Sequence, residues 1–251
     1  MRTIEATTLT AARFQNLSVV VTGASGGVGS AVSLALARGG ARLLLAGRSQ
    51  RRLEVLAHAA DSGGEPSIVF ASDLTEVVAA ERLAALVDTG LGGVDLLVHC
   101  IGAFSSTLLG ETTPEELDRL YRVNTRAPFL VTRALLPQLC ARKGQIAFVN
   151  SSVAVKARGG VGPYAASKHA LRALADALRD EVNALGVRVL SIYLGRTATP
   201  MQEEVHRLEG KTYRPETLLQ PQDVAAAVLD ALSLPRSAEV TDLHLRSMRK
   251  G

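Results

Sequence analysis

The sequence predicts an α/β fold in which a single doubly wound parallel sheet is covered by helices on both faces. Short apolar runs alternate with amphipathic stretches along the chain, as strands alternate with helices in parallel sheets. A glycine-rich segment follows the first apolar run, as it does in domains that bind dinucleotides. The 251 residues are 47% hydrophobic and 21% charged, which suits one domain with a sizeable core.

Each expected strand is a short apolar run that ends at a glycine or polar turn. The seven runs are residues 18–21, 41–46, 67–71, 94–99, 145–150, 187–193 and 240–245. Apolar residues at helical spacing predict helices between them, at residues 27–38, 51–60, 77–87, 114–140, 164–185 and 221–232. We expect the helix over 114–140 to bend at Pro128, which has no backbone N–H. Residues 17–251 would form one Rossmann-type domain, and residues 1–16, which lack this periodicity, a flexible N-terminal arm.

Composition excludes several classes of function. The net charge is +4, the basic residues are scattered and aromatic residues make up 4%, so we expect no nucleic-acid partner. No apolar stretch has spanning length and the first residues hold no leader-like apolar run, so we expect no membrane association and a cytoplasmic location. Cys100 and Cys140 have no metal-ligand spacing, which predicts free thiols and no metal.

The glycine-rich segment, residues 22–29, follows the first strand and opens the first helix. Glycines there allow a sharp turn and a close approach of a pyrophosphate, and the helix N-terminus supplies N–H donors. An ordinary glycine-rich turn is the alternative, and the position in the chain favours the cofactor interpretation. The predicted cofactor-binding residues of this segment are Thr22, Gly23, Ser25, Gly27, Val28 and Gly29.

The second strand ends at Arg48 and Ser49, with no Asp or Glu between residues 38 and 50. An acidic residue here would favour NAD, whereas an arginine accommodates the 2′-phosphate of NADP, so we predict NADP(H) with Arg48 as the clamp and Ser49 as its helper. Asp73 and Leu74 follow the third strand and complete this half of the predicted site. Asp73 either accepts from the adenine amino group or caps the next helix.

Tyr164 and Lys168 are four residues apart and share one face of the predicted helix. A free phenol titrates near pH ~10, and a neighbouring cation lowers that pKa. Ser151 ends the fifth strand and could bond the same substrate oxygen. A packed tyrosine beside a solvated lysine is the alternative. Asn124 is unusual inside a long helix, where asparagine competes for backbone hydrogen bonds.

Together these residues resemble the short-chain dehydrogenase/reductase family, in its NADP-preferring branch, over residues 17–245. The resemblance implies a catalytic tetrad of Asn124, Ser151, Tyr164 and Lys168, with Tyr164 and Lys168 also holding the cofactor. It matches the family's glycine motif at Thr22, Gly23, Gly27 and Gly29, and its nicotinamide-holding segment at Gly195, Thr197 and Thr199.

The chain departs from the family pattern at two places, before Gly102, which is kept as a predicted cofactor residue, and before Gly195. Cys100 and Ile101 replace asparagine and alanine, and Leu194 replaces the proline before Gly195. Cysteine is a weaker donor and acceptor than asparagine. These changes leave open a second interpretation: a cofactor-binding regulatory or interaction protein with the same fold and little turnover.

The resemblance implies an NADP(H)-dependent oxidoreductase that interconverts a small-molecule carbonyl and alcohol as a homodimer or homotetramer. Tyr164 would be the general acid and base, Lys168 would lower its pKa, and Ser151 would hold the substrate oxygen. The expected substrate-binding residues are Phe104, Ser151, Val153 and Tyr164. Basic residues in the flanking loops suit an anionic or acyl-carrier-linked substrate, or are simply solvated; they are Lys156, Arg158, His206, Arg207, Lys211 and Arg214.

Overall fold

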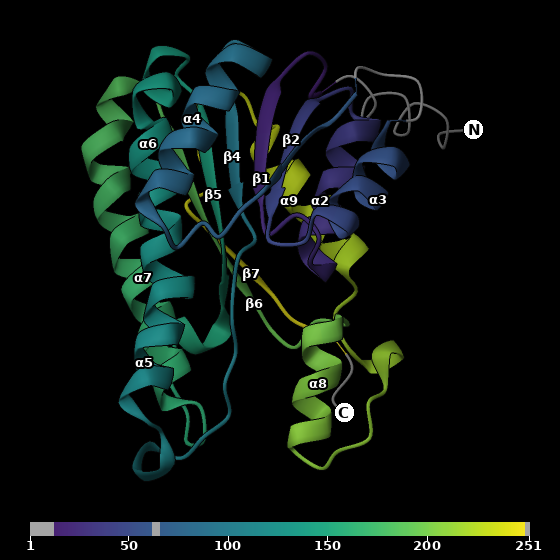
Figure 1. Ribbon diagram of the computed structural model, residues 1–251, viewed down its shortest axis with the longest axis vertical. Helices are drawn as coiled ribbons and strands as arrows, with labels where there is room; N and C mark the ends of the chain where they lie inside the picture. The colour runs from purple at the N-terminus through teal and green to yellow at the C-terminus, as the bar shows by residue number, and fades with distance from the viewer. Residues whose placement is uncertain (1–12, 62–65, 249–251) are drawn as a thin grey trace.

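A computed structural model of the protein describes residues 13–61 and 66–248 (Figure 1). Seven strands form one sheet in the order β3-β2-β1-β4-β5-β6-β7, and every neighbouring pair is parallel. The strands are β1 Ser18–Thr22, β2 Arg42–Gly47, β3 Ile68–Ala71, β4 Leu96–His99, β5 Gln145–Ser151, β6 Arg188–Leu194 and β7 Asp242–Leu245. The predicted doubly wound α/β fold is confirmed.

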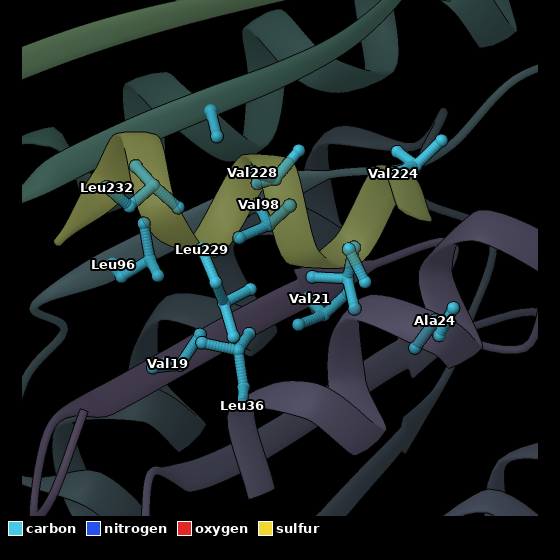
Figure 2. Close-up of a cluster of buried hydrophobic side chains, with 14 of the residues drawn as sticks. Val19, Val21, Ala24, Leu36, Leu96, Val98, Val224, Val228, Leu229 and Leu232 are labelled. Atoms are coloured by element: carbon cyan, nitrogen blue, oxygen red, sulfur yellow. The ribbon is translucent and has the colours of Figure 1, made fainter. Parts of the chain in front are cut away.

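Helices cover both faces of the sheet (Figure 1). One layer holds α2 Gly27–Arg38, α3 Gln50–Ala60 and α9 Pro221–Leu232; the other holds α4 Val77–Leu91, α6 Ala127–Ala141 and α7 Gly162–Val182. Figure 2 shows Leu229 of α9 and Leu36 of α2 directed at Val19 of β1, all buried. This is the burial of central strands on both faces that near-continuous apolar runs predict.

The long helix predicted over 114–140 is interrupted just before Pro128, where we expected a bend. Helix α5, Pro114–Tyr121, passes into a π-helical turn, Arg122–Arg126, and then into α6. Pro128 is the second residue of α6, which continues directly from this turn, so its missing N–H removes a hydrogen bond from a continuing helix. The turn includes Asn124, and π-helical turns inside α-helices often mark functional sites.

Two further segments differ from the expectation. Helix α8, Pro200–Leu208, forms in a stretch where we expected no helix, and both α8 and α5 lie at the lower end in Figure 1. The arm predicted over 1–16 falls outside the described residues except for 13–16. There Phe14 is buried at 2% exposure and Arg13 pairs with Asp230 at 3.2 Å, so packed structure already includes the end of that arm.

Candidate active site

The carboxyl ends of the central strands open into a cavity of about 680 Å³. It lies at the switch point between β1 and β4, where the strand order reverses, which is where open α/β sheets bind ligands. The structure brings most of the predicted site residues into its wall. They are Gly23, Ser25, Gly27, Val28, Gly29, Arg48, Ser49, Leu74, Gly102, Phe104, Ser151, Val153, Tyr164, Lys168, Gly195, Thr197 and Thr199.

Three predicted residues lie outside this wall. Thr22 is fully buried, and its hydroxyl bonds Nδ1 of His99 at 3.1 Å. Asp73 accepts from the backbone N–H of Thr75 at 3.0 Å, while Glu76 is the N-cap of α4, so Asp73 does not cap that helix. Thr22 therefore contributes to packing and Asp73 to the turn after β3. Asn124, the third, is described below.

Close backbone packing shapes the glycine-rich segment. Gly23 has a φ of +66°, and a Cβ there would lie 2.6 Å from the peptide that joins Cys100 to Ile101. A Cβ on Gly27 would lie 2.5 Å from Cγ2 of Thr199. Gly26, the N-cap of α2, offers no side-chain cap, so N–H groups of the first turn stay available to an anion at the positive end of the helix dipole.

Two arginines stand at the end of the cavity beside β2. Arg48 is exposed, Arg52 lies in the first turn of α3, and both belong to the wall. Within residues 13–61 and 66–248, neither side chain has a hydrogen bond or ion pair. No aspartate or glutamate of those ranges lines the cavity. Arg52 was missed by the sequence analysis, although its position one turn after Arg48 was a signal.

Asn124 acts on the cavity from behind its wall. Its Nδ2 donates to the carbonyl of Ala103 at 2.9 Å and to Oγ of Ser167 at 3.0 Å, and its Oδ1 accepts from the N–H of Ala103 at 2.7 Å. Ser167 in turn donates to the carbonyl of Tyr164 at 2.7 Å. The π-helical turn therefore ties the segment after β4 to helix α7. Nothing in the sequence pattern had singled out Ser167.

Ser151, Tyr164 and Lys168 all line this cavity. Burial raises the pKa of the Tyr164 phenol, and a hydrogen bond with Ser151 and the positive charge of Arg158 lower it only in part. The expectation that Lys168 leaves this pKa below its ordinary value is therefore wrong for the protein by itself. Burial lowers the pKa of Lys168 to about 8, and its Nζ donates to the carbonyl of Val149 at 3.3 Å. Desolvation is the largest cause of both shifts, because burial removes water from the charged form of each group.

The residues that depart from the family pattern also belong to the wall. Burial raises the pKa of the Cys100 thiol to about 12, so this thiol stays protonated at neutral pH. His99 of β4 makes side-chain hydrogen bonds to two neighbouring elements. Its ring bonds the hydroxyl of Thr22 in β1 at 3.1 Å and the hydroxyl of Thr132 in α6 at 2.9 Å. Leu194 extends β6 by one residue and pairs in register with Ser151. The departures leave the cavity open.

Helix α8 closes one side of the cavity with Met201, Gln202 and Val205. Thr199 caps this helix by accepting from the N–H of Gln202 at 3.2 Å. Its far end is tied down by Glu209, which accepts from Arg196 at 2.7 Å and from Lys211 at 2.8 Å. Burial raises the pKa of Glu209, but the hydrogen bonds and charges of those two partners outweigh it and bring the pKa to about 2.

The described ranges contain no group of three or more His, Cys, Asp or Glu residues that could hold a metal ion. The same ranges contain no helix that is both long enough and apolar enough to cross a membrane.

Comparisons with known proteins agree with this geometry. The family model for short chain dehydrogenases matches residues 18–210. A glycine betaine reductase of Emericella nidulans is 33% identical over 230 residues, which are 89% of this chain but 18% of that protein. The chain thus spans under a fifth of that relative's length.

Solved structures are similar over nearly the whole chain. A short chain dehydrogenase from Shigella flexneri complexed with NADP is 29% identical, with a TM-score of 0.85 over 93% of this chain and 98% of that one. An alcohol dehydrogenase from Thermococcus sibiricus complexed with 5-hydroxy-NADP is 30% identical, with a TM-score of 0.83 over 94% and 98%.

Proposed function

Because the chain belongs to the short-chain dehydrogenase family of oxidoreductases, we propose that it interconverts a small-molecule carbonyl and an alcohol by hydride transfer, with NADP(H) as cofactor. The observation that carries the proposal is that Ser151, Tyr164 and Lys168 line one cavity together with two arginines that have no partner within residues 13–61 and 66–248. A hydroxyl, a phenol and an ammonium suit proton transfer to a carbonyl oxygen.

The donors of the cavity fit NADP(H). The uncapped start of α2 offers backbone N–H groups for the pyrophosphate. Arg48 and Arg52 offer guanidinium groups for the 2′-phosphate, with the hydroxyl of Ser49 nearby. The lack of a carboxylate in the described wall removes the usual partner of an NAD ribose. The similar structures from Shigella flexneri and Thermococcus sibiricus, which carry NADP or a derivative of it, support this choice.

The nicotinamide, when bound, would supply or accept the hydride. Tyr164 keeps its proton at neutral pH because burial raises its pKa, so it is ready to protonate the oxygen of a carbonyl under reduction. Ser151 hydrogen-bonds the same oxygen, and the Lys168 ammonium stabilises the phenolate that remains. Asn124 acts through Ala103 and Ser167 by fixing Tyr164 relative to the segment after β4.

We further propose that two or more copies associate through α6 and α7. Phe129 of α6 and Leu174 of α7 are exposed apolar side chains at 44% and 38%, and pairing of these helices would cover them. Light scattering should give a mass of two or four chains, and a mass of one chain would refute this part.

The proposed function is tested by measuring both NADPH binding and the reduction of carbonyl compounds. NADPH fluorescence should report tighter binding than NADH, and a panel of simple ketones and aldehydes should be reduced by the wild-type protein. Ser151→Ala should lower kcat by about a hundredfold, the usual scale for a positioned catalytic group, while NADPH still binds. Binding without reduction of any panel member would favour a regulatory or interaction protein instead.

A further inference from the structure

One charge in the cavity wall is not explained by the cofactor. Arg158 lies on the exposed segment between β5 and α7 and lines the cavity, whereas Lys156 on the same segment does not. Within residues 13–61 and 66–248, its side chain has no hydrogen bond and no ion pair with a carboxylate. Its guanidinium is close enough to Tyr164 that its charge lowers the pKa of the phenol. Arg158 therefore belongs to the catalytic end of the cavity.

The other cations of the wall are accounted for. Arg48 and Arg52 lie beside β2, where the 2′-phosphate would bind. Arg196 is neutralised by Glu209 at 2.7 Å. Lys168 donates to the carbonyl of Val149 and faces the catalytic tyrosine.

No aspartate or glutamate of residues 13–61 and 66–248 lines the cavity around Arg158. Large apolar side chains of the wall are Phe104, Val153, Met201 and Val205, and its neighbouring polar residues Ser152 and Gln202 are uncharged. Phe104 packs edge-on against Tyr164 with ring centroids 5.0 Å apart. A guanidinium that no carboxylate of the described residues pairs with favours a planar or tetrahedral oxyanion, which it can bind through two parallel hydrogen bonds.

We propose that Arg158 binds an oxyanion carried by the substrate itself, so that the substrate class is carbonyl compounds with a carboxylate or phosphate a short chain away from the carbonyl. This proposal rests on the function proposed above, because it assigns the part of the substrate that does not react. Ser151 and Tyr164 hold the carbonyl oxygen, and Arg158 holds the other end. The anion fixes which way round the substrate lies.

Matched substrate pairs test the proposal. Acetoacetate is compared with methyl acetoacetate, levulinate with methyl levulinate, and dihydroxyacetone phosphate with dihydroxyacetone, each with NADPH. Wild-type protein should favour the anionic member of at least one pair by about tenfold or more in kcat/KM, the scale of one charged hydrogen bond. Whether the preference appears in the carboxylate pairs or in the phosphate pair shows which oxyanion Arg158 binds.

Arg158→Gln should bring that ratio to about one, whereas Arg158→Lys should keep part of it because the charge remains. Lys156→Gln is the matched control: it removes a cation two residues away that does not line the cavity, and the ratio should stay at the wild-type value. NADPH affinity of Arg158→Gln should equal that of the wild type.

Two results would overturn the proposal and leave the proposed function standing. In one, the wild-type protein reduces the neutral members as efficiently as the anionic ones. In the other, Arg158→Gln keeps the wild-type ratio. If no member of any pair and no ketone of the wider panel is reduced while NADPH binds, the proposed function fails, and the assignment of Arg158 fails with it.

Discussion

Replacing Lys168 with methionine should stabilise the cofactor-free protein at neutral pH while it removes activity. The Lys168 side chain is 4% exposed, and burial lowers its pKa from 10.5 to about 8. Because each pKa unit corresponds to about 1.4 kcal/mol, burying the charged ammonium costs the folded state roughly 3 kcal/mol. Methionine has a similar length and no charge, and it forfeits only the 3.3 Å bond to the carbonyl of Val149, worth about 1 kcal/mol. The net gain is about 2 kcal/mol.

The sign of the pH dependence makes this test sharp. Between pH 8 and pH 10.5 the folded lysine releases its proton while the unfolded lysine keeps it, so the free energy of unfolding of the wild type rises with pH through this window. Methionine does not titrate. The advantage of Lys168→Met should therefore be full at pH 7 and should shrink as the pH approaches 10.5.

Urea unfolding of both proteins without NADPH, from pH 7 to pH 10, measures this difference, because other titrating groups cancel between them. The melting temperature of Lys168→Met at pH 7 should be higher by about 4 to 8 °C. An equal or lower stability at pH 7, or a difference that stays constant with pH, would refute the reasoning.

Three further changes test other parts of the site. Gly23→Ala should lower the free energy of unfolding by about 2 to 4 kcal/mol, because Gly23 has a φ of +66° and the new Cβ would meet the backbone after β4. Gly110→Ala is the control and should change the free energy of unfolding little, because a Cβ there meets nothing within 4 Å. Similar losses in the two variants would contradict the packing argument. Arg48→Gln should raise the Kd of NADPH by about tenfold and leave the Kd of NADH unchanged. Arg51→Gln is the control and should change neither Kd. If Arg48→Gln changed both Kd values equally, the assignment of Arg48 to the 2′-phosphate would be wrong. Glu209→Gln should lower the free energy of unfolding by about 1 to 2 kcal/mol at pH 7. The wild-type carboxylate has a depressed pKa of about 2, so its contribution to stability is lost as the pH falls from about 4.5 toward 2. The free energies of unfolding of Glu209→Gln and the wild type should therefore converge in that range. A difference that persists in acid would exclude the ion pair as its cause.

Much of the fold could be predicted because each strand is locally marked. The run at residues 18–21 holds three successive valines and is followed by a glycine-rich segment, and the structure has β1 at Ser18–Thr22. Helix α8 was missed because it is short, with nine residues, and mostly polar, and because its cap, Thr199, had been assigned to the cofactor. Buried Phe14 lay in a segment without periodicity, so only tertiary packing against the core reveals it.

The candidate site was predicted where a motif has a fixed spacing along the chain. Ser151, Tyr164 and Lys168 depend on such spacing, and the structure brings them together. The bonds of Asn124 to Ala103 and Ser167 join segments at least 21 residues apart, which no local pattern reveals. The raised pKa of Tyr164 depends on burial. Charged neighbours such as Lys168 can be identified in the sequence, but the extent of burial is known only from the folded structure.

The most direct test of the central claim is transfer of an isotope label. NADPH carrying deuterium at both C4 positions of the dihydronicotinamide, incubated with the best-reduced ketone of the panel, should give an alcohol with deuterium on the carbinol carbon. Tyr164→Phe should still bind the cofactor and should form this product at least about a hundredfold more slowly. An unlabelled alcohol, or labelled alcohol formed at the same rate by Tyr164→Phe, would contradict hydride transfer with Tyr164 as the proton donor.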